Sequence, residues 1–173
     1  MSRYSDEDAR LAALRSFDIL DTASEAEFDR IVQQAARTLG TPIALMSLID
    51  EDRQWFKSKV GLEIAETPRS MSFCTHAIQG DEVFVVPNAK HDPRFADNSL
   101  VTGDPSIRFY AGAPLKASTG RRIGTICVID NKPRATLTDV EKRQLESLAD
   151  LVMKALERRQ QRKAARQLGS MAL

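Results

Sequence analysis

Apolar residues recur at helical spacing near the N-terminus of this chain. Leu11, Leu14 and Phe17 predict a first helix that opens at residues 5–8 and that the segment 19–22 interrupts. A second helix should follow, because Ser24 and Glu27 have the spacing of a capping box. Its apolar stripe consists of Phe28, Ile31, Val32, Ala35 and Leu39, and Gly40 is the expected stop.

The middle of the chain has the apolar patterns of strands. Residues 43–49 are almost all apolar, which predicts a central strand covered on both faces. Residues 54–60 alternate and predict a half-exposed antiparallel partner. A short strand is expected at 83–86, and a hairpin over 107–130 that turns at Ser118-Thr119-Gly120. Short helices are expected at 73–79 and within 91–103.

A long helix should close the chain. Thr138 and Glu141 form a second capping-box pattern, and the apolar positions that follow lie near heptad spacing at Leu145, Leu148, Val152, Ala155 and Leu156. The run 158–166 is strongly basic, which is typical of a solvated helix end, and the helix is expected to stop at Gly169. The element order predicts an α+β fold, with the terminal helices on one face of a mostly antiparallel sheet. The other face should carry a pocket, under loops 61–80 and 88–106.

Composition excludes several classes of function. The chain has 173 residues, 42% hydrophobic and 28% charged, which suits one domain with a substantial core. Its net charge of +1 gives no reason to expect nucleic acid or an anionic membrane as a partner. No apolar run approaches the roughly 20 residues of a membrane span, and the polar start does not resemble a signal peptide. We therefore expect a cytoplasmic protein.

The segment 72–76 is the sharpest local cluster of candidate chemistry. If a helix begins near Phe73, its free N–H groups favour a polar ligand there, and the thiol of Cys74 lies in the first turn. Alternatively, Phe73 is core, Cys74 is a small buried hydrophobe and His76 is a surface or capping residue. A metal site or a triad of Cys74, His76 and Asp92 is not expected, because zinc needs three or four ligands and His91 is the only other imidazole.

The predicted hairpin supplies further candidates. Arg108 and Tyr110 share one face of the first strand, and Thr125 and Cys127 share one face of the second. A buried Arg108 needs an anionic partner. That partner is a ligand, Asp92 or Glu66, or else Arg108 makes a structural ion pair with loop 88–106.

Six ordered segments resemble a GAF domain: PIALMSLID (42–50), RQWFKSKVGL (53–62), ETPRSMSFCTHAIQG (66–80), VFVVPNAKHDPRF (83–95), IRFYAGAPL (107–115) and IGTICVID (123–130). The resemblance is to the bacterial sensory subgroup found with histidine kinases and cyclic-di-GMP enzymes. It implies a GAF/PAS-like antiparallel sheet of about five to six strands. It further implies a GAF domain at 23–158, after a helix and connector at 1–22 and before a basic extension at 159–173.

The resemblance also implies where a ligand binds. Contacts in GAF domains come from the pocket face of the sheet and the inserted helices, which here points to Phe73, Cys74, Asp92, Phe95, Arg108, Tyr110, Thr125 and Cys127. The implied function is that of a regulatory domain that senses a small molecule, and not of an enzyme. The ligand and any cofactor are left open, since a further motif of cyclic-nucleotide-binding GAF domains is missing near the last helix. The resemblance also implies a homodimer through the terminal helices, and an output domain or partner kinase or cyclase outside this chain.

Three alternatives stay open beside the sensor. The first is a dimerisation or scaffold module without a ligand. The second is a free methionine sulfoxide reductase that uses Cys74, although the segment 105–110 lacks the cysteine found in that branch. The third is a bilin photoreceptor, which Cys74 and His76 suggest but which their surroundings do not resemble.

Overall fold

A single antiparallel sheet of six strands lies at the centre of the molecule. The computed structural model describes residues 3–171, with side chains from Asp6 onward. The strands are β1 Ile43–Ile49, β2 Arg53–Val60, β3 Glu66–Pro68, β4 Phe84–Val86, β5 Phe109–Lys116 and β6 Arg122–Asp130. Their order is β3-β2-β1-β6-β5-β4, and every neighbouring pair is antiparallel. The fold is therefore α+β, as the element order predicts.

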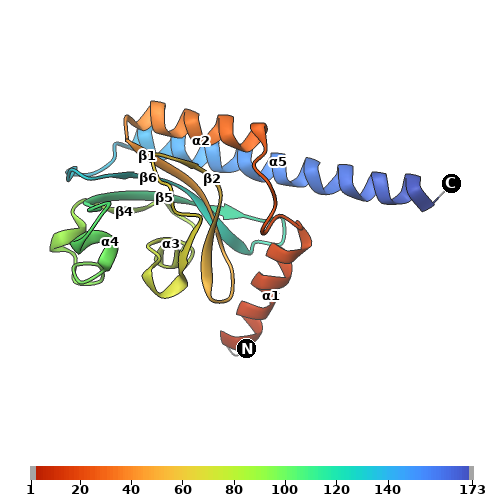
Figure 1. Ribbon diagram of the computed structural model, residues 1–173, viewed down its shortest axis with the longest axis horizontal. Coiled ribbons are helices and arrows are strands. Elements are labelled where there is room, and N and C mark those ends of the chain that lie inside the picture. The colour runs from red at the N-terminus through yellow and green to blue at the C-terminus, as the bar shows by residue number, and fades with distance from the viewer. Residues whose placement is uncertain (1–2, 172–173) are drawn as a thin grey trace.

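Helices of two kinds cover the two faces of this sheet. The long ones are α1 Arg3–Ser16, α2 Ala26–Leu39 and α5 Asp139–Met171, and the short ones are η1 Arg69–Met71, α3 Cys74–Ala77, η2 Ala89–His91 and α4 Ser99–Thr102. Figure 1 shows α2 and α5 side by side on one face, and α3 and α4 on the other. α1 lies at one end of the sheet, and the second half of α5 extends well beyond the sheet (Figure 1). No helix in residues 3–171 is long and apolar enough to cross a bilayer.

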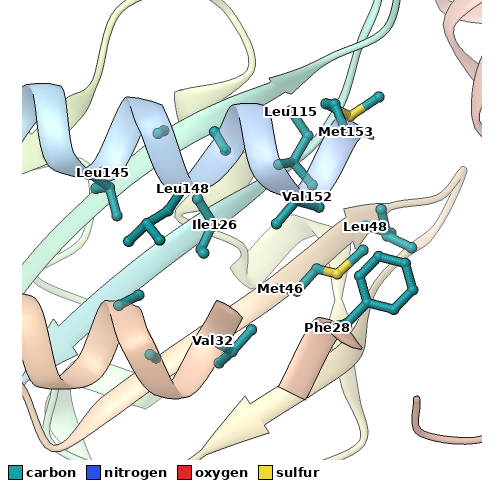
Figure 2. Packing of buried hydrophobic residues seen from close by; sticks show 14 of the residues in the cluster. Phe28, Val32, Met46, Leu48, Leu115, Ile126, Leu145, Leu148, Val152 and Met153 are labelled. Atoms are coloured by element: carbon teal, nitrogen blue, oxygen red, sulfur yellow. The ribbon is translucent and has the colours of Figure 1, made fainter. Parts of the chain in front are cut away.

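The larger core lies between the sheet and the two long helices. Phe28 and Val32 of α2 meet Met46 and Leu48 of β1, as Figure 2 shows. Beside α2 on the same face of the sheet, α5 contributes Leu145, Leu148, Val152 and Met153, which pack near Leu115 and Ile126 (Figure 2). The helical stripes read from the sequence are therefore the buried faces of α2 and α5. β1 is buried along its whole length, as predicted for a central strand.

The expectation of a half-exposed strand at 54–60 is wrong. Residues 54–58 are all buried, because the sheet is covered on both faces here. A bulge against Met46 and Ser47 of β1 also disturbs the alternation. As a result, Lys57 and Ser58 both contact the segment 22–29, where Ser58 Oγ donates to Asp29 at 2.6 Å. An alternating pattern of polar residues here marks buried hydrogen-bonding groups and not solvent exposure.

The two capping-box patterns have opposite outcomes. At α5, Thr138 Oγ1 accepts from the Glu141 amide at 3.1 Å and the Glu141 carboxylate accepts from the Thr138 amide at 3.0 Å. At α2, the cap residue is Glu25, and no side chain caps the helix, so the Ser24–Glu27 prediction is wrong. The reason is that Glu27 pairs with Arg158 of α5 instead of reaching back. The predicted stop at Gly169 is also wrong, since α5 runs to Met171.

Candidate functional site

A small apolar cavity lies on the face of the sheet opposite α2 and α5. Its volume is about 30 Å³. Strands β1, β2, β5 and β6 form its floor and the loops between residues 61 and 107 form its walls. The lining residues are Ile43, Leu45, Gln54, Phe56, Leu62, Ile64, Thr67, Met71, Phe73, Cys74, Leu100, Pro105, Ile107, Tyr110, Cys127 and Ile129. This is the pocket face predicted from the sequence, under the predicted loops.

Stacked aromatic rings close one side of the cavity. The rings of Phe73 and Phe95 are parallel, with centroids 4.0 Å apart, and Tyr110 lies 5.3 Å from Phe73. Phe95 also meets the edge of His76 at 4.9 Å. All three rings of the stack are almost fully buried. The aromatic residues therefore fix the position of α3 and of Cys74, which follows Phe73.

The thiol of Cys74 is the centre of a buried polar cluster. Its sulfur accepts a hydrogen bond from Thr125 Oγ1 at 3.1 Å and lies 3.0 Å from the Tyr110 hydroxyl. Cys127 lies on the same face of β6 as Thr125, with its sulfur 4.0 Å from Ser47 Oγ. Tyr110 reaches this point across Gly112, where an added Cβ would lie 2.2 Å from the tyrosine oxygen. Gly112 thus lets the hydroxyl approach the sulfur.

These neighbours separate the two thiols in acidity. Burial raises the pKa of the Cys74 thiol, but the surrounding donors Cys127, Thr125, Tyr110 and Ser47 outweigh it and lower the pKa to about 7. Burial and the interaction with Cys74 instead raise the pKa of Cys127 well above its usual range. Burial and the nearby thiols also raise the pKa of Tyr110. These neighbours therefore favour the thiolate form at Cys74 over that at Cys127.

A second set of polar side chains lines the cavity near β3. Gln54 donates to Thr67 Oγ1 at 3.0 Å and accepts from Ser72 Oγ at 3.1 Å. Ser72 in turn accepts from the Thr75 amide at 3.1 Å, which holds the start of α3. Within the described residues, every buried side-chain nitrogen or oxygen has a hydrogen-bond partner. The polar groups of the cavity therefore satisfy one another.

The eight predicted contact residues fall into two groups. Phe73, Cys74, Tyr110 and Cys127 line the cavity, with Thr125 and Phe95 directly behind them. Asp92 and Arg108 do not line it. The Asp92 carboxylate pairs with Arg94 at 2.7 Å, and this contact lowers the pKa of Asp92.

Arg108 contacts neither of the two carboxylates expected for it, because Asp92 pairs with Arg94 and Glu66 with Arg53. Its guanidinium donates to the carbonyl oxygens of Val101 at 2.8 Å and Ile107 at 3.0 Å. It therefore fixes the end of the loop as expected, but through backbone carbonyls and not through an anion. Dipolar carbonyl groups can satisfy a half-buried guanidinium without a carboxylate.

Sequence reasoning missed the part of the cavity that β1, β2 and β3 provide. Ile43, Leu45, Gln54, Phe56 and Thr67 all line it. Period-two alternation gives a usable signal, because Ile43 and Leu45 share one face of β1. The bulge at Lys57 hides the same signal in β2. In residues 3–171, no group of three or more His, Cys, Asp or Glu side chains is arranged to hold a metal ion.

Comparison with known proteins decides the family. The GAF domain profile matches residues 24–156. The chain belongs to the GAF domain family. A cyclic di-GMP phosphodiesterase from Pseudomonas aeruginosa is 46% identical over 148 residues, which is 86% of this chain and 25% of that protein. This GAF chain thus spans about a quarter of the length of the curated relative that it matches.

Solved structures share the GAF fold with this chain. The GAF domain of PixJ from Thermosynechococcus elongatus, in its blue-light-absorbing form, has a TM-score of 0.63 at 14% identity, over 99% of this chain and 98% of that one. A type II free methionine-R-sulfoxide reductase from Thermoplasma acidophilum has a TM-score of 0.61 at 16% identity, over 75% and 89%. At such low identity these similarities establish the fold alone.

Proposed function

We propose that this chain is a regulatory GAF domain of bacterial signal transduction, which responds to a small molecule in the cavity between the sheet and residues 61–107. The observation that carries the proposal is the cavity itself. It lies between α3, α4 and the centre of the sheet, and two cysteines, a tyrosine and a glutamine lie among otherwise mostly apolar walls. Apolar walls with a few converging polar groups are typical of small-molecule sites.

The size of the cavity restricts the ligand. Sites for drug-sized molecules measure about 300–1,000 Å³, whereas this cavity measures about 30 Å³. A ligand with more than a few heavy atoms therefore requires the walls to move outward. Ile64, which is 39% exposed, and the half-buried Leu62 and Leu100 form the wall that can move at the least cost in buried area. We expect a small, mostly apolar ligand with one polar group directed toward Gln54, Thr67 or Cys74.

An ion-pair path connects the cavity wall to the N-terminal helix. Arg69 of η1 lies two residues from Met71 of the wall, and it pairs with Glu7 of α1. Glu7 also binds Arg10, whose guanidinium donates to the Ile49 carbonyl at the end of β1. Movement of the wall on ligand binding would therefore move α1 relative to the sheet. A ligand produces such a signal only if it binds the two states with different affinity.

The partners proposed for this domain follow from its helices. We propose a homodimer through the terminal helices, and an output domain or a partner kinase or cyclase connected to them. The projecting half of α5 supports this proposal, because it carries exposed Leu168 and Met171 beyond the sheet. The proposed role is regulatory and not catalytic.

The test is a ligand screen by native mass spectrometry on the whole chain and two variants. Leu100→Phe fills the cavity from its half-buried wall, and Leu151→Phe adds the same bulk to the exposed face of α5. We expect a small molecule that binds the wild-type chain and the Leu151→Phe variant, and that Leu100→Phe excludes. A ligand that binds all three equally does not occupy this cavity, and that result would refute the proposal.

A scaffold without a ligand is the second candidate, and one observation favours it. The cavity has room for about one or two water molecules, and every buried polar side-chain atom of the described residues is already partnered. Sedimentation at micromolar concentration, read together with the ligand screen, separates the candidates. A dimer that binds a ligand supports the sensor, a dimer that binds nothing in the screen supports the scaffold, and a monomer counts against the scaffold. Reduction of free methionine sulfoxide that Cys74→Ser abolishes would instead show an enzyme.

A further inference from the structure

Both cysteines of the chain line the same small cavity. Cys74 opens α3 and Cys127 lies on β6, so the two sulfurs come from elements on opposite sides of the space. Both sulfurs lie in one buried cluster, because Cys74 Sγ contacts Thr125 Oγ1 at 3.1 Å, two residues before Cys127 on β6, and Cys127 Sγ lies 4.0 Å from Ser47 Oγ. Neither forms a disulfide in this structure. A thiol pair facing a common cavity is a candidate for chemistry that the proposed sensory function does not use.

We propose that small hydroperoxides oxidise Cys74 in this cavity, and that Cys127 resolves the product as a disulfide. The assignment depends on three observations. The sulfur of Cys74 has two hydroxyl neighbours, Thr125 at 3.1 Å and Tyr110 at 3.0 Å. The volume of about 30 Å³ admits a molecule of two heavy atoms such as hydrogen peroxide. The second thiol lines the same space. This modification does not require the ligand of the proposed function.

The hydroxyl neighbours select Cys74 as the attacking sulfur. A thiolate, and not a thiol, attacks peroxides, and hydrogen bonds donated to the sulfur favour the thiolate. The hydroxyl contact that Cys127 makes with Ser47 is longer, at 4.0 Å, than the two contacts of Cys74. The order of reaction is therefore fixed by the cluster: Cys74 is oxidised first, and Cys127 follows.

The two steps balance with hydrogen peroxide as the oxidant. The Cys74 thiol ionises and its thiolate attacks one peroxide oxygen; the O–O bond breaks, and the departing hydroxide takes up the proton released by that ionisation to form water, which leaves a sulfenic acid. The Cys127 sulfur then attacks the Cys74 sulfur, the S–O bond breaks, and the sulfenic hydroxyl leaves as a second water molecule with the Cys127 proton. Two thiols and one peroxide give one disulfide and two waters.

The disulfide would change the domain at a specific point. It would join α3 to β6, so the wall of the cavity would be covalently held against the centre of the sheet. The Cys74 sulfur would also lose the interactions that it makes as a thiol with Thr125 and Tyr110. The oxidised domain would have a smaller cavity and a less mobile wall than the reduced domain.

The test is peptide mapping of the native full chain after treatment with hydrogen peroxide and alkylation of the remaining thiols. We expect the loss of both alkylatable thiols, a mass lower by two hydrogen atoms, and a cross-linked peptide that joins Cys74 to Cys127. In Cys127→Ser, dimedone should trap a sulfenic acid at Cys74. In Cys74→Ser, Cys127 should stay reduced. Because the wild-type map needs no variant, a folding defect in either variant leaves the result readable.

Two kinetic controls test the role of the cavity. Cumene hydroperoxide is too large for the space and should react at least about tenfold more slowly than hydrogen peroxide. Thr125→Val removes one donor and should slow oxidation about fivefold, the factor that one hydrogen bond of ordinary strength is worth. The proposal is overturned if Cys127 reacts first, if Cys74 accumulates as sulfenic acid without a disulfide in the wild-type chain, or if both peroxides react equally fast.

Discussion

Glu25 joins three elements that are far apart in the sequence, so its removal is a sharp test of how the domain is held together. Its carboxylate contacts Lys57 Nζ of β2 at 2.6 Å and Arg159 Nε of α5 at 2.9 Å. The Lys57 side chain is fully buried and that of Arg159 is 11% exposed. Glu25→Gln keeps the shape of the side chain and removes its charge, so both cations lose the only carboxylate within 4.0 Å in the described residues.

The magnitude follows from what the two cations retain. Removing one partner of a buried ion pair costs about 3–5 kcal/mol, because the other charge stays buried without compensation. Lys57 keeps Thr22 Oγ1 at 2.8 Å and the Ala23 carbonyl, and Arg159 keeps the carbonyls of Phe17 and Asp18. Because these neutral acceptors remain, we expect the free energy of unfolding to fall by the lower value of this range, about 3 kcal/mol. For a domain of this size the melting temperature should fall by about 6–12 °C.

Equilibrium unfolding in urea measures the effect, and Glu27→Gln is the matched control. Glu27 lies two residues away and also pairs with an arginine of α5, but Arg158 is 56% exposed. An exposed pair contributes less than about 1 kcal/mol, so the control should barely move the transition. Equal effects of the two substitutions would refute the reasoning, because burial would then not decide the energy.

The pH dependence of the same difference gives a second readout. Burial opposes ionisation of Glu25, but Lys57 and Arg159 outweigh it and lower the pKa of the carboxyl group below its ordinary value. A lowered pKa in the folded state stabilises the fold above the pKa of the unfolded chain, and this contribution is lost as pH falls through the folded pKa. The difference between wild type and Glu25→Gln should therefore be complete at neutral pH and shrink in acid.

Three further substitutions test other features. Gly112→Ala should lower the free energy of unfolding by about 1–3 kcal/mol and displace Tyr110 from Cys74, because the new Cβ would lie 2.2 Å from the tyrosine oxygen. Near-ultraviolet circular dichroism and urea unfolding measure the two effects, and Gly80→Ala, with open space around it, is the control. Thr138→Ala should cost about 1 kcal/mol through loss of the α5 cap, whereas Ser24→Ala should cost almost nothing in the same urea assay, since no side chain caps α2. Glu7→Gln should destabilise by about 1 kcal/mol, a value reduced for solvent screening. Because Arg10 and Arg69 lower the pKa of Glu7 from 4.5 to about 2, the loss should be complete above pH 4.5, shrink as pH falls below it in thermal melts, and vanish at about pH 2; an undiminished loss at pH 2 would exclude the ion pairs as its cause.

The sequence predicts the fold well where one physical signal dominates. The stripes on α2 and α5 and the apolar run of β1 each reflect burial against a large partner. The prediction fails where a residue has two competing partners. Glu27 has the spacing of a capping residue, but it pairs with Arg158, which is 131 positions away. Lys57 has the pattern of an exposed strand residue, but it lies beneath the connector before α2.

The candidate site is likewise predicted where one local signal dominates and missed where a distant partner decides. Strand alternation brings Tyr110 and Cys127 to the pocket face, and the position of Cys74 in the first turn of α3 directs its sulfur toward them. Sequence reasoning places Arg108 beside an anion, whereas the structure provides carbonyl oxygens of the loop. Such carbonyl groups are present in every segment and leave no mark in the sequence. For the same reason, the contribution of Gln54 and Thr67 depends on a strand pairing that no local pattern reveals.

α5 is one unbroken helix of 33 residues (Figure 1), and Arg159 is its last buried residue. Beyond Arg159, within the described residues, only the exposed contacts of Gln160, Arg162 and Lys163 tie the helix to the domain. The helix therefore acts as a lever with its fulcrum at Glu25. From Arg159 to Met171 the arm measures about 18 Å at 1.5 Å per residue. A tilt of about 10° at the fulcrum would move the tip by about 3 Å, more than half the rise of one helical turn. A movement too small to reshape the core could thus become a displacement large enough for another protein segment to read.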